Sequence, residues 1–369
     1  MKEGKELFVT CPGNLEELLA TELKEFGIPF IRKGFRGVYV PKSIENVYLI
    51  NYCSRIATRV LLPLTQFRCS GKEDLYAAAK KIDWSLYLNV KKTFAIDSNV
   101  SHKELRNSLY ASLVVKDAIC DFFRDQCGER PSIDTQNPDV QLNLFIHQNH
   151  ASLSLDTSGA PLYKRGYRAH SVDAPLQENI AAAILRYAGY NKDEVLCDPF
   201  CGSGTFLIEA AMSATFTPSG FYRKSFGFFN LPDFKEEEWQ AFKETQNKKI
   251  IPLAKDKIFG SDSDPVVIGH CKKNIEIAGF KEAITPIQKD VRNLSCQATL
   301  VVSNPPYGKR VSLLAYTYKD FGSFIEKTGA KAHILCPESF LIKETGLRIK
   351  GKLDLMNGGL DVTLFSLTR

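Results

Sequence analysis

The chain has 369 residues, of which 44% are hydrophobic and 24% charged, and its formal net charge is +6. This composition excludes a disordered chain, and the length indicates two or three domains. No apolar run approaches the roughly 18 to 20 residues of a membrane helix, and the acidic N-terminus lacks the apolar core of a secretory signal. We therefore expect a cytoplasmic protein with no membrane partner.

The ten cysteines and six histidines are scattered without a CxxC pair or a zinc-ligand spacing, which predicts free thiols and no metal site. Positive charge is unevenly distributed, since residues 51–100 and residues 301–350 each hold eight Lys and Arg against four Asp and Glu. Two basic regions are compatible with a polyanionic partner such as RNA, although a solvated lysine face is the commoner explanation of any one cluster.

The first 160 residues mix helical and extended patterns, as small α+β modules do. Within a first unit, residues 1–65, we expect strands at 7–9 and 35–40 and helices at 14–26 (capped by Asn14) and 43–52. Within a second unit, residues 66–160, we expect helices at 74–82 and 105–124 and strands at 93–99, 140–147 and 151–157.

A change of character near residue 160 predicts a third unit, residues 161–369. Ser158-Gly-Ala-Pro161 interrupts the chain, and the segment that follows, LYKRGYR at 162–168, is basic and aromatic. Strand and helix patterns then alternate, which favours a parallel, doubly wound α/β sheet. The expected elements lie at 177–187, 195–196, 206–213, 258–260, 265–278, 284–287, 300–302, 332–335 and 362–367.

A glycine-rich turn, DPFCGSGT at 198–205, follows the first strand of this third unit and opens a helix. Gly202 and Gly204 allow a ligand to approach the backbone closely, and the N–H groups at the start of the helix point toward the same place. The Lys of a Walker loop is missing, which disfavours a phosphate cradle. Alone, such a turn is weak support for nucleotide binding.

Acidic residues follow the next two strands. Asp262 stands at the end of one strand, where a carboxylate commonly binds ribose hydroxyls, and Asp290 follows the other, where it can accept from an adenine amino group. Asp264 precedes a proline and is better interpreted as a helix N-cap. Each aspartate alone is typical of a cap or turn, but their order along successive strands favours a bound adenosyl group.

The motif NPPYG at 304–308 directly follows the apolar strand LVV. Its two prolines stiffen the turn and leave carbonyl acceptors exposed, Asn304 adds a side-chain acceptor, and Tyr307 offers a ring for a planar base. Acceptors placed in this way hold the hydrogens of an exocyclic amino group. The aromatic insertion at 214–250 is either a lid over such a pocket or a segment packed on the sheet edge.

Taken together, DPFCGSGT, GSD, KD and NPPYG resemble the amino-directed S-adenosylmethionine methyltransferases. Through PGNLEELLATEL, LRNSLYASLVVKDAICDFF, RPSIDTQNPDVQLNLFIH and LYKRGYR, the chain resembles the THUMP-domain RNA methyltransferases. The similarity is greatest to the guanine-N2 methyltransferases of bacterial 23S ribosomal RNA, in the N-terminal half of their fused form. The resemblance implies a Rossmann-like class I methyltransferase domain preceded by a ferredoxin-like unit (1–65) and an RNA-binding THUMP unit (66–160).

By motif match, the resemblance also implies site residues. Those at the S-adenosylmethionine site would be Asp198, Cys201, Gly202, Ser203, Gly204, Asp262, Asp290 and Asn304. Those holding the target amino group would be Asn304, Pro305, Pro306 and Tyr307. From the basic regions we expect RNA contacts by Lys80, Lys81, Lys91, Lys92, Lys164, Arg165 and Arg168.

The activity expected from these features is methylation of the N2 amino group of a guanosine in 23S ribosomal RNA or a large-subunit precursor. Because an NPPY turn binds any planar amino group, a tRNA guanine or an adenine N6 in DNA remains an alternative substrate. A second alternative is a non-catalytic RNA-binding or ribosome-assembly protein with a vestigial cofactor site, against which the complete set of motif residues argues.

Overall fold

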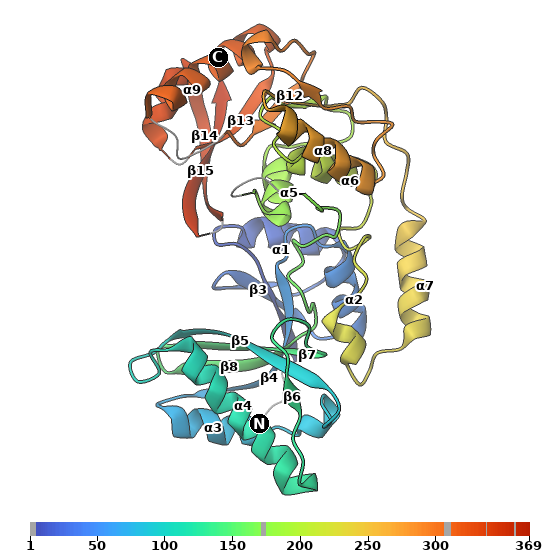
Figure 1. Ribbon diagram of the computed structural model, residues 1–369, viewed down its shortest axis with the longest axis vertical. Coiled ribbons are helices and arrows are strands. Elements are labelled where there is room, and N and C mark those ends of the chain that lie inside the picture. The colour runs from blue at the N-terminus through green and yellow to red at the C-terminus, as the bar shows by residue number, and fades with distance from the viewer. Residues whose placement is uncertain (1–4, 171–174, 306–310, 337, 358) are drawn as a thin grey trace.

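The computed structural model describes residues 5–170, 175–305, 311–336, 338–357 and 359–369. Figure 1 shows an elongated molecule with the third unit at one end, the first unit in the middle and the second unit at the other end. Two sheets form its framework in the described residues, one of eight strands and one of seven. The first two units share the larger sheet, and the third unit contains the smaller one.

The larger sheet has the strand order β2-β3-β1-β4-β8-β7-β5-β6. Its elements in the first unit are β1 (Glu6–Thr10), α1 (Glu16–Glu25), β2 (Arg32–Gly34), β3 (Gly37–Pro41), α2 (Ile44–Cys53) and β4 (Arg59–Arg68). Those in the second unit are α3 (Lys72–Lys80), β5 (Thr93–Ser101), α4 (Ser108–Cys127), β6 (Ser132–Ile133), β7 (Val140–His147) and β8 (His150–Asp156). Strand β4 belongs to both units, because it pairs with β1 on one side and β8 on the other.

In the first unit, the expected cap by Asn14 is wrong, and the expected strand at 35–40 is found as β3 with slightly shifted bounds. Asn14 does not cap α1: its backbone has φ +67°, the helix begins at Glu16, and the Asn14 amide donates to the Asp354 carbonyl instead. The segment at 35–40 is the second half of a hairpin, in which β2 pairs with β3 through a turn at Phe35 and Arg36. Gly37 is required there, because an added Cβ would lie 2.4 Å from the Val9 carbonyl oxygen.

The third unit contains the doubly wound sheet that the alternation predicts, with the order β11-β10-β9-β12-β13-β15-β14. Strands β9 to β13 are parallel, and β15 and β14 add an antiparallel hairpin. The strands are β9 (Leu196–Asp198), β10 (Ile258–Asp262), β11 (Ile287–Gln288), β12 (Leu300–Ser303), β13 (Lys331–Cys336), β14 (Arg348–Asn357) and β15 (Leu360–Thr368). The helices are α5 (Glu178–Tyr187), α6 (Thr205–Ala214), α7 (Glu236–Asn247), α8 (Pro265–Ile277) and α9 (Val311–Thr328).

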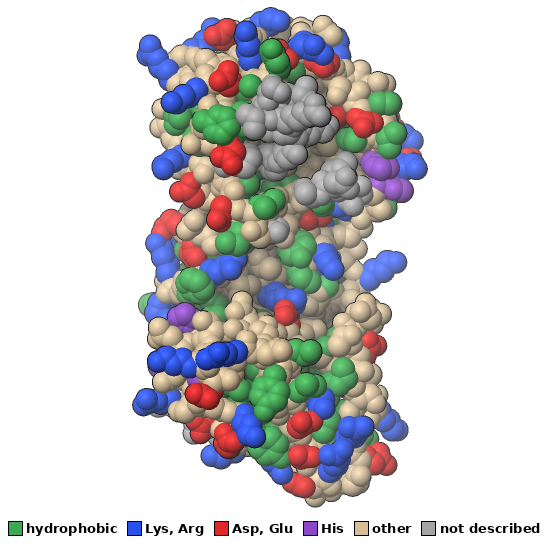
Figure 2. Space-filling view, turned by 60° about the vertical axis from the view of Figure 1, so that its left-hand side comes forward, with side chains coloured by type: hydrophobic (Ala, Val, Ile, Leu, Met, Phe, Trp, Pro, Cys, Tyr) green, Lys and Arg blue, Asp and Glu red, His purple; other side chains and the backbone are tan. Residues whose placement is uncertain are grey.

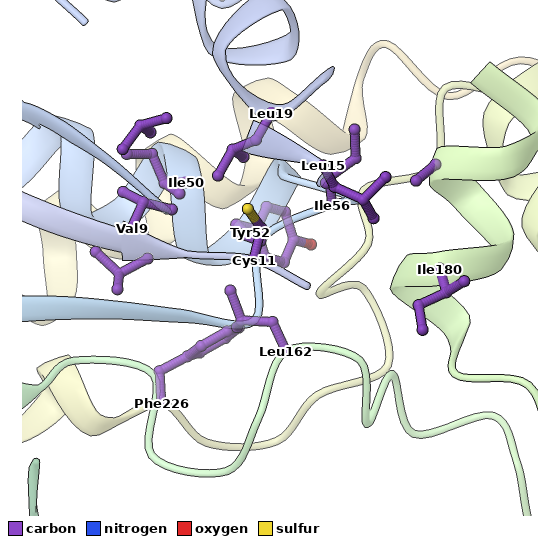
Figure 3. Packing of buried hydrophobic residues seen from close by; sticks show 14 of the residues in the cluster. Val9, Cys11, Leu15, Leu19, Ile50, Tyr52, Ile56, Leu162, Ile180 and Phe226 are labelled. Atoms are coloured by element: carbon purple, nitrogen blue, oxygen red, sulfur yellow. The ribbon is translucent and has the colours of Figure 1, made fainter. Parts of the chain in front are cut away.

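One apolar cluster continues from the first unit into the third (Figure 3). Leu15, which precedes α1, and Leu19 of α1 belong to it, as do Ile56 before β4, Leu162 after β8 and Ile180 of α5. Since each of these side chains is at most 1% exposed, the two units have no separate surfaces along this contact. The shared core fixes the first unit against the helices that carry the third unit's sheet.

The aromatic insertion packs, but on the first unit instead of the sheet edge. Phe228 and Trp239 are buried, and their ring centroids lie 5.0 Å apart. Tyr48 and Tyr52 of α2 meet them, with centroid distances of 5.1 Å from Tyr48 to Phe228 and 5.3 Å from Tyr52 to Trp239. Edge-to-face aromatic contacts of this kind hold elements together. We therefore interpret these rings as an inter-unit contact and not as a lid.

Candidate active site

Four expected site segments meet at one edge of the smaller sheet. Asp198 ends β9, Asp262 ends β10, Asp290 follows β11, and Asn304 follows β12. These strands are adjacent and parallel in the order β11-β10-β9-β12, so their carboxyl ends lie on the same edge. In open α/β sheets that edge is where ligands bind.

The glycine turn lies against the end of β10. The Cys201 N–H donates to the Ser261 carbonyl oxygen at 2.9 Å, and the Gly202 N–H donates to Asp262 Oδ2 at 3.2 Å. Gly202 has φ +52° and an added Cβ there meets nothing within 4 Å, so this face of the turn opens onto free space. Gly204, at φ +88°, turns toward the protein, where an added Cβ would lie 2.8 Å from Cys271 Sγ.

Asp198 lies beneath this turn and is only 2% exposed. Its carboxylate accepts from the Ser303 hydroxyl and from the Phe200 N–H. Burial raises the pKa of Asp198 to about 7, and the nearby charge of Asp262 acts in the same direction. These contacts favour a role in shaping the turn. Cys201 and Ser203 are likewise buried.

Asp262 is half-buried and accepts from the N–H groups of Gly202 and Asp264. Burial raises the pKa of its carboxyl group. Asp264 caps α8 as predicted, since its carboxylate accepts from the Val266 and Val267 N–H groups at 2.8 and 3.4 Å. Asp262 is therefore the strand-end carboxylate that faces the open side of the turn.

Asp290 is held by a neighbour along the chain. Its two carboxylate oxygens each accept from the Arg292 guanidinium at 2.9 Å, and this pairing lowers the pKa of Asp290. Asp290 also caps the short 3₁₀ turn at 291–293 by accepting from the Arg292 N–H. A ligand amino group would share this carboxylate with Arg292.

The turn expected to hold the target amino group begins at the end of β12, on the same edge of the sheet. Asn304 is half-buried and Pro305 is buried, immediately after the fully buried β12. Pro306 and Tyr307, both expected to hold the target base, lie outside the described residues. Ser303 was missed by the sequence reasoning, although its position before Asn304 was a signal that it contributes to the site.

Two of the expected RNA-binding arginines have other partners. Arg165 is wrong as an RNA contact, because it is 0% exposed and its Nε and Nη2 both lie 3.3 Å from the carboxylate of buried Glu209 in α6. A buried carboxylate needs such a partner. The Arg168 side chain is 14% exposed, pairs with Glu178 at 3.1 Å and donates to Thr205 Oγ1 at 2.8 Å. Arg168 thus connects α5 with the start of α6.

The expected lysine contacts divide into two groups. Lys80 pairs with Asp125 at 2.7 Å, and Lys92 Nζ donates to Asn230 Oδ1 at 3.0 Å. The other three, Lys81, Lys91 and Lys164, are exposed. For these three, RNA contact stays a prediction, while Lys80 and Lys92 would have to exchange a protein partner for a phosphate.

Among the described residues, no three His, Cys, Asp or Glu side chains are grouped as they would be around a metal ion. No described helix combines the length and apolar character that a membrane crossing requires. All ten cysteines fall in the described part of the chain and are free thiols.

Three family models match the chain in succession. An RlmL ferredoxin-like domain matches residues 6–61, a THUMP domain matches residues 69–156, and an RMKL-like methyltransferase domain matches residues 165–339. With the strand order described above, these matches confirm the expected fold class, a Rossmann-like methyltransferase domain preceded by ferredoxin-like and THUMP regions.

Similar proteins are found both by sequence and by structure. The chain is 36% identical over 365 residues to "Ribosomal RNA large subunit methyltransferase K/L" of Shewanella frigidimarina, covering 96% of this chain and 51% of that protein. It is 34% identical to the "Putative RNA methyltransferase" slr0064 of Synechocystis sp., covering 97% and 95%. The chain therefore spans about half the length of the K/L relatives. The structure described as "SMU.472, a putative methyltransferase complexed with SAH" superimposes with a TM-score of 0.89, at 25% identity, over 100% of this chain and 99% of that one.

Proposed function

The chain belongs to the THUMP-domain RNA methyltransferases that carry the RlmL ferredoxin-like and RMKL-like methyltransferase domains, and from that premise we propose its reaction and substrate. The proposed reaction is transfer of a methyl group from S-adenosylmethionine to the exocyclic N2 amino group of a guanosine in 23S ribosomal RNA. The observation that carries it is the position of Asn304, directly after β12, the strand adjacent to β9, which leads into the open glycine turn.

The described residues fit the cofactor, which is S-adenosylmethionine in this family. Gly202 faces free space where a side chain would intrude, and Asp262 stands beside it with a half-buried carboxylate able to accept from ribose hydroxyls. Asp290 follows the next strand along the same edge of the sheet, where it would accept from the adenine amino group. When bound, the cofactor supplies an electrophilic methyl group on a sulfonium.

The chain's own part in the reaction is to orient the target amino group. Asn304 and Pro305 present oxygen acceptors at the end of β12, and acceptors there would hold the two N2 hydrogens so that the nitrogen lone pair points at the methyl group. No strong general base is required, because the proton leaves after the nitrogen has become positively charged. Catalysis is then mostly positioning and electrostatic stabilisation in a dry site.

The choice of RNA as the substrate is supported by the THUMP match. It is also supported by the name of the K/L relatives, which describes methyltransferases of large-subunit ribosomal RNA. A guanine inside a helix cannot reach a strand-edge pocket, so the base must leave its stack, at a cost of about a few kcal/mol that is smallest in loops and bulges. A single-stranded or weakly paired target is therefore expected, and the site of action would be the cytoplasm.

The substrate is tested by mapping modified nucleosides in ribosomal and transfer RNA from a strain that lacks this protein. Loss of one N2-methylguanosine from 23S ribosomal RNA, restored by the wild-type gene and not by an Asn304→Ala gene, is the expected result. Loss from a tRNA instead would move the activity to that substrate. Unchanged modification of both RNAs would contradict the proposed activity.

A further inference from the structure

We propose that the open face of the second unit's sheet binds a single-stranded segment of the RNA substrate. In this proposal the Phe145 and His147 rings stack on bases, and Arg68 and Lys103 bind phosphates. The inference rests on the proposed function, since the ligand is the RNA that carries the methylated guanosine. It also places the RNA grip on a different face from Lys80 and Lys81, which lie at the end of α3.

The two faces of this sheet differ sharply. Helices α3 and α4 pack on one face, and Leu142, Leu144 and Ile146 of β7 are buried there. The alternate residues of β7 point the other way, and of these Phe145 is 37% exposed and His147 is exposed. An exposed phenylalanine on a polar sheet face is typical of a surface that another molecule covers.

The neighbours of Phe145 leave its ring accessible. In the strand register, Asn99 of β5 lies beside it on one side and Ser152 of β8 on the other, and both are short and polar. The Phe145 and His147 rings are nearly parallel, with an angle of 13° between their planes and centroids 6.4 Å apart. We call these two rings, Phe145 and His147, the platform. Flat rings flanked by hydrogen-bonding groups suit nucleobases, because every base has a face that can stack.

Cations gather at the end of the same face. The register places His147 beside both Ser101 and His150, and His150 beside Arg68. A hollow of about 770 Å³ opens there, and the residues that line it are Arg68, Ser101, His102, Lys103, Gln148, Asn149 and His150. None of these lining residues is acidic, and Arg68, Lys103 and His150 are exposed. The charge therefore complements a phosphate backbone that continues from the stacked bases.

An acidic residue of this face shares its arginine partner with a second carboxylate. Asp97 of β5 lies on the same face, two residues before Asn99, and Arg59 pairs with it at 3.5 Å. The Arg59 guanidinium also bonds the buried carboxylate of Asp156. Because one guanidinium serves two carboxylates, we expect the phosphate contacts at the Arg68 and Lys103 end of this face and not beside Asp97.

The open face of this sheet is also directed toward the third unit, which contains Asn304. In Figure 1, α3 and α4 lie on the far side of the sheet from the third unit, so the open face looks toward the rest of the molecule. Figure 2 shows the surface hollowed between the two ends, with hydrophobic, basic and acidic side chains mixed over the lower part. RNA held on this face can extend along the hollow toward the edge that carries Asn304.

The test measures binding of a fluorescently labelled single-stranded RNA oligomer and of a matched duplex by anisotropy, with the full chain. Phe145→Leu keeps an apolar side chain and removes the aromatic face, so we expect single-strand affinity to fall about 5- to 100-fold. Phe145→Trp restores the face and should restore the affinity. Duplex affinity should change little in either variant, because paired bases cannot stack on the platform.

A salt titration tests the phosphate contacts. Arg68→Gln and Lys103→Gln should each flatten the slope of log affinity against log salt by about 0.7, the value for one contact on a single strand. Lys248→Gln, an exposed lysine just after α7 on another part of the molecule, is the matched control and should leave the slope unchanged. Circular dichroism and cofactor affinity verify that each variant is folded.

Three outcomes separate this proposal from the proposed function. Unchanged single-strand affinity in Phe145→Leu, or an equal loss in Phe145→Trp, would overturn the platform even if the wild type methylates RNA. A wild-type protein that binds the oligomer through Phe145 but methylates no RNA would overturn the proposed function and leave the platform standing. Loss in Phe145→Leu with rescue in Phe145→Trp supports the platform.

Discussion

The Ser303 hydroxyl donates a hydrogen bond of 2.5 Å to the Asp198 carboxylate, joining the ends of two adjacent strands across 105 positions of sequence. Both side chains are buried. Because Ser303 immediately precedes Asn304, this bond connects the glycine turn proposed to receive the cofactor with the turn proposed to receive the base. The protonation state of Asp198 is therefore expected to influence both.

The raised pKa of Asp198, about 7, predicts a pH-dependent stability. Since the folded pKa lies above the ordinary value of 3.8, the stabilising contribution is complete at low pH and is lost as the pH rises through about 7. Asp198→Asn remains neutral, so its stability relative to the wild type should be higher at pH 8 than at pH 5. Urea unfolding of the cofactor-free proteins at both pH values measures this, and a pH-independent difference would contradict it.

The buried ion pair between Arg165 and Glu209 should stabilise the fold and play no part in gripping RNA. Glu209→Leu strands a buried guanidinium, which costs about 3–5 kcal/mol of unfolding free energy. The double variant Arg165→Met/Glu209→Leu should cost less than the sum of the single changes, because neither charge is then left alone. Additive costs in the double-mutant cycle would mean that the two groups do not depend on each other.

Asp262 should contribute directly to cofactor affinity. Asp262→Ala removes the acceptor beside Gly202, and S-adenosylmethionine binding should weaken by about 1–3 kcal/mol, the cost of unpairing a polar group. Asp264→Ala is the matched control, because that carboxylate caps α8 and should affect mainly stability. Calorimetry distinguishes the two, and an unchanged affinity in Asp262→Ala would remove it from the cofactor site.

The lysines predicted from the sequence should differ according to their partners. Lys164 is exposed, so if it touches a phosphate, Lys164→Gln should flatten the salt slope of RNA affinity by about 0.7. Lys80 already pairs with Asp125, so Lys80→Gln should flatten the slope less. Equal effects of the two substitutions would show that the Asp125 pair does not compete with RNA.

Features that depend on residues close in the sequence were predictable, and features that depend on residues distant in the sequence were not. Asp264 as an N-cap and the site aspartates at strand ends were predictable, because a cap and a strand end are set by residues a few positions away. Arg165 was mistaken for an RNA contact because its partner Glu209 lies 44 positions further on, inside an apolar helix. The inter-unit role of Trp239 depended on Tyr52, which no local pattern connects to it.

The most direct measurement is a single-turnover reaction with 23S ribosomal RNA and S-adenosylmethionine, followed by mass analysis of the nucleosides. For the wild type, we expect methyl incorporation as N2-methylguanosine. For Asn304→Ala, we expect cofactor affinity close to the wild type and a rate lower by roughly 10²–10³, the usual effect of losing one oriented polar group. A methyl group on another base or atom, or a wild-type rate in Asn304→Ala, would contradict the account.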